Sequence, residues 1–185
     1  MKYYLILFTV FTILTTLSYW QNFTGANSTQ LRILTDSKAY EFVSKNMDGR
    51  LNDALNRFEF KIPVSSFKSV NDSSDIWFLQ RLTDGNEFIS IYASLPDDKD
   101  AELDLSYFKG SKSTNLNGQI KLGSSLFEDD IDFNGILTNG NQSMAFNFNV
   151  FLNERELSFA KVNSEKILEI EITAKGDKIA GLTSN

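Results

Sequence analysis

The sequence predicts an all-β, antiparallel domain with one short helix. Eight segments alternate apolar and polar residues with a period of two, and only an extended strand keeps such residues on opposite faces. Small residues that tolerate tight turns lie beside or between many of these segments. The 185 residues are 42% hydrophobic and 23% charged, which are globular proportions and disfavour a disordered or fibrous chain.

Residues 1–26 are predicted to be a signal peptide or a membrane anchor that precedes the domain. Lys2 is followed by an uncharged stretch over residues 3–20. This pattern is typical of a secretory signal, and small residues at 16–18 or 24–26 suit its cleavage. An uncleaved anchor is the alternative, because about 20 residues span a bilayer. Both interpretations place the domain outside the cytoplasm, periplasmic or secreted, with membrane contact only through this segment.

Predicted strands follow one another through residues 27–185, which we expect to form one domain. The clearest lies at residues 57–64, where Phe58, Phe60 and Ile62 alternate with charged residues. The same alternation occurs at residues 89–95, 103–107, 116–122, 131–137, 144–150, 157–159 and 168–172, and more weakly at 31–34 and 39–43. Short spacing between these segments favours antiparallel connections.

Turn signals agree with this order of strands. Pro63 is expected at a strand end, because proline gives no amide to the ladder. Residue pairs that suit tight hairpins are Asp84-Gly85, Asn139-Gly140 and Gly176-Asp177.

One short helix is predicted between residues 67 and 82. Ile76, Leu79 and Leu82 recur every three residues in this stretch. Asn, Asp and Ser residues at positions 71–74 precede them and form a helix start signal.

The apolar faces of the strands must be hidden from water. An antiparallel sheet of this size either stacks on a second sheet or closes into a barrel. Eight strands that close enclose an interior for side chains or for one small ligand. Thirteen of the sixteen phenylalanines lie after residue 26, so this interior is expected to be aromatic. Rings that fill a core and rings that line a pocket give the same alternation, and both alternatives stay open here.

The composition excludes several kinds of site. The chain has no histidine and no cysteine, which removes imidazole bases, thiolate nucleophiles, disulfides and the zinc sites that need these ligands. Its 18 basic and 24 acidic residues give a net charge of −6, the wrong sign for a broad nucleic-acid surface. The sequence has no glycine-rich phosphate loop and no nucleophile elbow. We therefore expect no catalysis, no cofactor and no nucleic-acid partner.

One acidic motif resembles half of a calcium-binding loop. Asp130, Asp132, Asn134 and Gly135 have the spacing of the first half of an EF-hand, but its last ligand position falls on Asn141. Apolar residues alternate with the acids, which indicates a solvated strand face. We expect no metal site.

Three stretches carry a resemblance to a known family. The sequence FEFKIPVSSFKS at residues 58–69 follows DSKAYEF at residues 36–42, and NGQIKL occurs at residues 117–122. This order resembles the YceI-like family of secreted proteins that bind polyisoprenoids and lipids. The resemblance covers roughly residues 31–174. It implies an antiparallel, eight-stranded, lipocalin-like barrel, so that residues 27–185 would be a YceI-like β-barrel domain, and it implies export and an apolar central pocket for an isoprenoid or fatty chain.

Two functions follow from these observations. The first is an exported, non-catalytic binding protein that holds a hydrophobic or amphiphilic ligand in the barrel lumen. The second is an extracytoplasmic structural or protein-interaction β-domain with a plugged core. For the first, a residue of the helix, Trp77, is expected to close one end of the lumen. The expected ligand-binding residues on the strands are Phe58, Phe60, Ile62, Ile89, Ile91, Leu116, Ile120, Phe133, Phe146 and Phe148.

Overall fold

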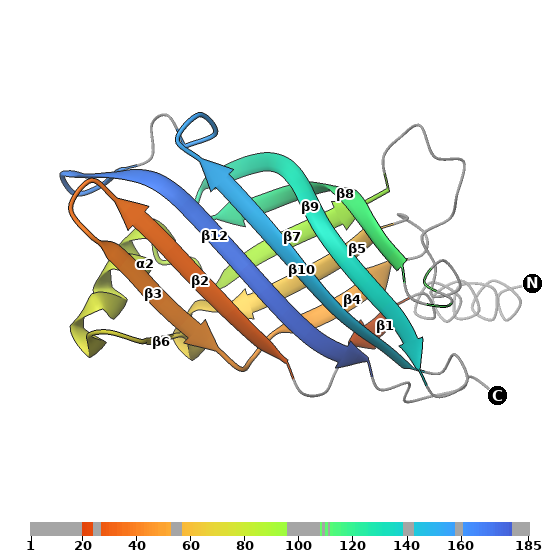
Figure 1. The fold of residues 1–185 in the computed structure, drawn as a ribbon. Helices are drawn as coiled ribbons and strands as arrows, with labels where there is room; N and C mark the ends of the chain where they lie inside the picture. Colours follow the sequence, from red (N-terminus) through yellow and green to blue (C-terminus); the bar gives the residue numbers. More distant parts are fainter. Residues whose placement is uncertain are drawn as a thin grey trace, which may run out of the picture.

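A computed structural model describes most of the predicted domain. The described residues are 20–23, 27–52, 57–95, 108, 110, 112–138, 143–157 and 161–178. Over these residues the chain forms a 12-stranded sheet that curls into a half-barrel (Figure 1). The predicted all-β, antiparallel fold with a short helix is confirmed.

The strands vary widely in length. Eight of the described strands have six residues or more: β2 (Ser28–Thr35), β3 (Ala39–Ser44), β5 (Arg57–Pro63), β7 (Phe88–Ser94), β8 (Lys112–Leu122), β9 (Ser125–Thr138), β10 (Ser143–Asn153) and β12 (Glu165–Lys178). The shorter ones are β1 (Trp20–Phe23), β4 (Asp48–Asn52), β6 (Lys68–Ser69) and β11 (Lys161–Val162).

The strand order explains how the sheet curls. It runs β1-β4-β5-β7-β8-β9-β10-β12-β2-β3-β6, with β11 paired to β12. Every pairing is antiparallel, and most join neighbours along the chain. The pairing of β12 with β2 brings the last long strand beside the first one. The side chains of Arg32 and Glu169 meet across this pairing, with Nη1 and Oε1 2.8 Å apart.

The two faces of the sheet separate as the alternation predicts. Along β8 the residues Leu116, Ile120 and Leu122 are buried inside the curl, while Asn115 and Asn117 are exposed outside it. The predicted segments at 31–34, 39–43, 57–64, 89–95, 116–122, 131–137, 144–150 and 168–172 all contain strands of the sheet. The segment at 103–107 lies outside the described residues.

Two local predictions are wrong at the residues that the structure describes. Leu157, the one described residue of the predicted strand at 157–159, lies in a turn, where its amide donates to the Asn153 carbonyl at 3.0 Å. Gly176 and Asp177 lie inside β12. Glycine is needed there because a Cβ atom would lie 2.9 Å from Cζ of Phe146.

The other turn signals have mixed outcomes. Pro63 is the last residue of β5, as predicted. Asp84 and Gly85 adopt positive φ angles of 50° and 71° in the turn between the helix and β7. The pair at 139–140 lies outside the described residues. Gly123, with a φ of 63°, lies in the turn between β8 and β9 and packs against the backbone of Thr83.

The predicted helix is α2 (Ile76–Leu82), preceded by the 3₁₀ turns η2 (Val64–Ser66) and η3 (Ser73–Asp75). The Asp72 carboxylate accepts a hydrogen bond from the Ser74 amide at 2.8 Å and so caps η3, the turn that leads into α2. The N-cap of α2 itself, Asp75, makes no side-chain capping bond. Phe78 and Leu79 are buried against the curled sheet. Among the described helices, none is both long and apolar enough to cross a bilayer.

The predicted leader at residues 1–26 lies mostly outside the described residues and stays a prediction. Residues 20–23 of this segment form β1, which pairs with β4 at one edge of the sheet. The backbone of that short stretch therefore takes part in the fold.

Candidate functional site

Six phenylalanine rings meet inside the half-barrel. We call this set the aromatic core: Phe58, Phe60, Phe108, Phe133, Phe146 and Phe148. The centroids of Phe58 and Phe133 lie 5.0 Å apart, and those of Phe60 and Phe148 lie 4.7 Å apart. These distances suit stacked and tilted aromatic pairs. The rings therefore contact one another directly across the interior.

The curl of the sheet is what assembles these rings. In the strand order, β7 and β8 separate β5, which carries Phe58 and Phe60, from β9, which carries Phe133. A flat sheet would hold these strands roughly 14 Å apart. The rings of Phe58 and Phe133 therefore meet across the interior, because the sheet is curved.

Glycines make room for the rings. Gly135 on β9 and Gly176 on β12 both lie opposite Phe146 in the strand register. A Cβ atom on Gly135 would lie 2.5 Å from Cδ1 of Phe108. At both glycines an aromatic ring covers bare backbone, an arrangement that lets a sheet curve while its inner face stays packed.

The aliphatic residues predicted for the site share this inner face. Ile62, Ile89, Ile91, Leu116 and Ile120 are fully buried. They come from β5, β7 and β8, the strands on one side of the aromatic core. Ten of the eleven predicted site residues therefore lie on one continuous inner surface.

The structure places Trp77 elsewhere. Its side chain is 38% exposed and meets Phe78 edge-to-face, with centroids 5.7 Å apart. The neighbouring Phe78 is fully buried and stacks on Tyr40 at 3.8 Å, so Phe78 closes this end of the interior. Residues 76–79 are all apolar, and a seven-residue helix is too short for periodicity to show which of them points inward.

A polar network lies beside Phe78 at the same end. Glu165 on β12 accepts hydrogen bonds from the Tyr40 hydroxyl at 2.8 Å and from the Thr35 hydroxyl at 2.9 Å. Lys38 pairs with Asp75 at 2.6 Å and lies 4.4 Å from the centroid of the Tyr40 ring. The network ties β2, β3 and β12 to the start of α2. Sequence reasoning missed it, because its partners are up to 130 residues apart and carry no local signal.

The network perturbs two titratable groups in opposite senses. Burial and the bond to Glu165 raise the pKa of the Tyr40 phenol far above its ordinary value, so the phenol remains a donor. Partial burial alone would raise the pKa of Glu165. Hydrogen bonds from Tyr40, Thr35 and Ser37, together with the charge of Lys38, outweigh it and lower that pKa below its ordinary value.

Acid is expected to weaken this network. Because folding lowers the pKa of Glu165, its contribution to the free energy of unfolding is complete above about pH 4.5, the ordinary value, and is lost as the pH falls through the lowered value. We expect Glu165→Gln to lower the free energy of unfolding by about 1–2 kcal/mol at neutral pH. The difference between variant and wild type should shrink in acid when both are unfolded with urea.

Glu171→Gln, on the same strand, is the matched control and should follow the wild-type pH dependence. Asp129 has a pKa raised by partial burial and by the nearby acids Glu156, Asp130 and Asp132. The ionisation of Asp129 changes the free energy of unfolding with pH in the direction opposite to Glu165. This effect is the same in wild type and in both variants, so the comparison isolates Glu165. A difference between Glu165→Gln and wild type that does not change with pH would contradict this assignment.

The half EF-hand motif lies on the outer face of β9. Asp130, Asp132 and Asn134 are exposed, while Ile131 and Phe133 between them are buried. The interpretation as a solvated strand face is confirmed. In the described part of the chain, no group of three or more acidic side chains is placed to hold a metal ion.

Comparison with solved structures identifies the fold. The sequence matches no protein-family model and no curated protein. Among solved structures, a polyisoprenoid-binding domain from Saccharophagus degradans, implicated in plant cell wall breakdown, superposes with a TM-score of 0.61 at 7% identity. The alignment covers 87% of this chain and 98% of that one. The chain has the YceI-like fold.

Two further solved structures resemble the YceI-like fold of this chain. BcnA of Burkholderia cenocepacia has a TM-score of 0.50 at 10% identity, and the alignment covers 80% of this chain and 95% of that one. A mutant YCEI protein has a TM-score of 0.47 at 8% identity, with 74% and 84% covered. The first two structures confirm, at very low identity, the fold that the sequence resemblance implied.

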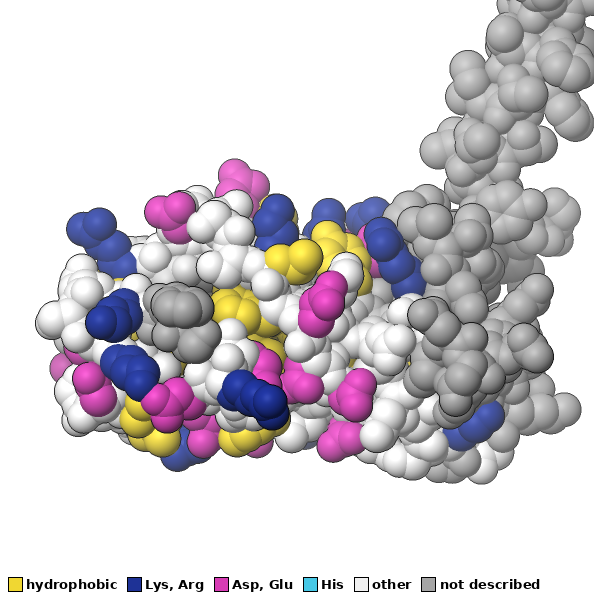
Figure 2. Space-filling view, turned by 90° about the horizontal axis from the view of Figure 1, so that it is seen from above, with side chains coloured by type: hydrophobic (Ala, Val, Ile, Leu, Met, Phe, Trp, Pro, Cys, Tyr) yellow, Lys and Arg dark blue, Asp and Glu magenta, His cyan; other side chains and the backbone are white. Residues whose placement is uncertain are grey.

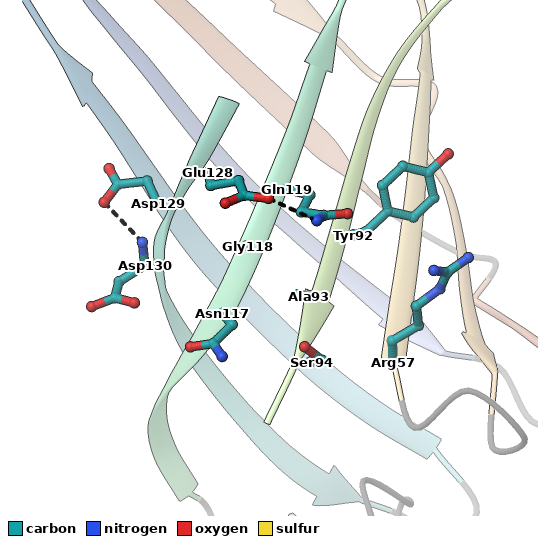
Figure 3. Close-up of a pocket in the computed structure, with 10 residues that line it drawn as sticks. All are labelled: Arg57, Tyr92, Ala93, Ser94, Asn117, Gly118, Gln119, Glu128, Asp129 and Asp130. Carbon is teal, nitrogen blue, oxygen red and sulfur yellow. Dashed lines mark hydrogen bonds between the residues drawn. The ribbon is translucent and has the colours of Figure 1, made fainter. Parts of the chain in front are cut away.

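The outer face of this YceI-like half-barrel is polar. Figure 2 shows one face of the molecule, where basic and acidic side chains are interspersed and some hydrophobic side chains reach the surface between them. A hollow of about 640 Å³ crosses the outer face of β5, β7, β8 and β9 (Figure 3). We call it the outer trough. Its side chains include Arg57, Tyr92, Ser94, Asn117, Gln119, Glu128, Asp129 and Asp130.

Proposed function

We propose that this protein is an exported, non-catalytic binding protein that holds an isoprenoid or fatty chain inside the half-barrel. The observation that carries this proposal is the continuous inner surface, on which β5, β7, β8, β9 and β10 each place buried aromatic or aliphatic side chains. Burial of an apolar chain against such a surface stabilises a complex by about 25 cal/mol per Å². The fold shared with a domain named for polyisoprenoid binding supports the same ligand class.

The ligand must displace part of the ring packing. Ring centroids in the aromatic core lie 4.7–6.5 Å apart, which leaves no layer free between contacting rings. Strand order places β1 and β6 at the two ends of the sheet, and no pairing between them closes the curl in the described residues. Among the described strands no backbone ladder therefore joins these two ends of the sheet, and side chains can move there without breaking a strand pairing.

Export belongs to this proposal and is supported by the character of residues 1–26. The position of β1 bears on where a signal would be cleaved. Cleavage near residues 16–18 keeps β1 and its pairing with β4, whereas cleavage near 24–26 removes this edge strand.

The proposal predicts a co-purifying apolar molecule. Protein purified from its own host should release an isoprenoid or fatty compound on organic extraction, detected by mass spectrometry. Its mature amino terminus, measured on the same sample, checks export. Delipidated protein should bind geranylgeraniol or palmitate. Phe133→Trp should weaken that binding at least tenfold, because a larger ring in the aromatic core takes space from the ligand at a cost in stability of about 1–3 kcal/mol.

Phe151→Trp is the matched control for this experiment. Phe151 lies on β10 but is 44% exposed on the outer face, so its replacement should leave binding unchanged. Circular dichroism must show that both variants are folded. Protein that arrives empty and rejects both ligands would contradict the proposal, as would equal loss of binding in both variants.

One observation favours the second function, a structural or protein-interaction domain. The rings of the aromatic core contact one another directly across the interior, as they would in a plugged core. Under that function the protein acts through its outer face, and the empty, ligand-rejecting protein described above is the expected result.

A further inference from the structure

The outer trough is built on a rigid part of the sheet. Strands β8 and β9 pair without interruption from Lys112–Gly135 to Leu122–Ser125, and β7 and β5 extend the ladder. The trough therefore has a floor of four hydrogen-bonded strands, roughly 14 Å across. A site on such a floor is preorganised, so a ligand loses little affinity to ordering of the protein.

Two rows of polar side chains cross this floor. The strand register sets Asp130, Asn117, Ser94 and Arg57 in one row, and Glu128, Gln119 and Tyr92 in the next. Figure 3 shows the carboxylates at one end of the trough, the amide side chains in the middle, and Tyr92 and Arg57 at the other end.

Most of these side chains keep hydrogen-bonding capacity. Gln119 donates one N–H to Glu128 at 3.0 Å, which fixes its amide and leaves its carbonyl oxygen and second N–H for a ligand. In the described part of the chain, the side chains of Ser94 and Asn117 have no hydrogen-bond partner. Amides and hydroxyls both donate and accept, so the centre of the trough offers donors and acceptors side by side.

The ends of the trough restrict the charge of a ligand. Glu128, Asp129 and Asp130 bring three carboxyl groups to one end, which disfavours anions. At the other end, Arg57 is already paired with Glu59 at 2.6 Å and lies 4.9 Å from the centroid of the Tyr92 ring. Its charge is neutralised, and its planar group and the ring of Tyr92 give a flat wall.

We propose that the outer trough binds a neutral oligosaccharide. Sugar hydroxyls donate and accept in the same way as the amides and hydroxyl of Asn117, Gln119 and Ser94. The C–H face of a sugar ring suits the flat wall of Tyr92. The trough lies on the opposite face of the sheet from the aromatic core, so this site is separate from the lipid site proposed above.

Calorimetric titration with cellohexaose, xylohexaose, chitohexaose and maltohexaose tests this inference. We expect at least one of these neutral probes to bind at millimolar concentration or below, and polygalacturonate, an anionic probe, not to bind. Asn117→Ala and Gln119→Ala should each weaken the binding about tenfold, the loss of one good hydrogen bond. Saturation of the protein with palmitate should leave the sugar affinity unchanged.

Asn115→Ala is the matched control, because Asn115 is exposed on the same strand, β8, but lies outside the trough. It should change the affinity less than twofold. The proposal is overturned if none of the four probes binds, if polygalacturonate binds more tightly than the neutral probes, if palmitate competes, or if Asn115→Ala weakens binding as much as Asn117→Ala. Lipid binding is measured independently, so failure here leaves the proposed function standing.

Discussion

Phe146→Asp is expected to abolish the cooperative fold. The Phe146 side chain is 5% exposed and packs between Gly135 and Gly176 on the neighbouring strands. The substitution removes an aromatic ring, which costs about 3–5 kcal/mol, and places a carboxylate among the apolar rings of the aromatic core. Together these effects approach the whole stability of a typical domain, about 5–15 kcal/mol. Thermal unfolding followed by circular dichroism should show no cooperative transition.

Phe151→Asp provides the comparison on the same strand. Phe151 is 44% exposed and lies opposite Glu171 on the outer face, so a carboxylate there stays hydrated and meets only a like charge. We expect a loss below about 1 kcal/mol. A cooperative transition near the wild-type midpoint for Phe146→Asp would mean that the faces of β10 are assigned backwards.

Phe60→Ala is expected to lower the free energy of unfolding by about 3–5 kcal/mol without changing the fold. Phe60 is 1% exposed, and its ring lies 4.7 Å from Phe148 and 5.4 Å from Phe146. The surrounding rings come from strands on both sides of the interior, so they cannot collapse into the space without changing the curl. Guanidinium denaturation of the delipidated protein measures the loss.

The cavity left by Phe60→Ala also connects stability with the proposed function. Geranylgeraniol should bind the folded chain and not the unfolded one. It should therefore restore part of the lost stability, and the restored part should grow with its free concentration. Phe151→Ala should lose less than about 1 kcal/mol and should gain no more from the ligand than wild type. A loss of the same size in both alanine variants would show that Phe60 is not a central member of the aromatic core.

The inner and outer faces of the sheet thus carry two different proposals. The inner face is apolar and already packed, so a ligand there competes with the rings for space. The outer trough is polar and open, so a ligand there competes with water. The variants chosen for one face leave the other unchanged, and the two sets of experiments can therefore fail independently.

The local features of this protein can be predicted from its sequence. Alternation at Phe58, Phe60 and Ile62 fixes which side chains share a face, because successive residues of a strand point to opposite sides. The 3₁₀ turn η3 that leads into α2 follows from the capping carboxylate of Asp72, which contacts an amide only two residues away. Such signals depend on neighbours along the chain and can be read without the fold.

Which of these faces meet depends on the packing of distant strands. Phe58 and Phe133 are 75 positions apart, and the 5.0 Å between their rings depends on the curl of all the strands between them. Three other features have the same origin. Phe78 points inward in place of Trp77, Gly176 lies inside a strand, and the Tyr40 hydroxyl donates to Glu165. Each depends on how distant elements pack, and the periodicity within a single segment carries no information about that packing.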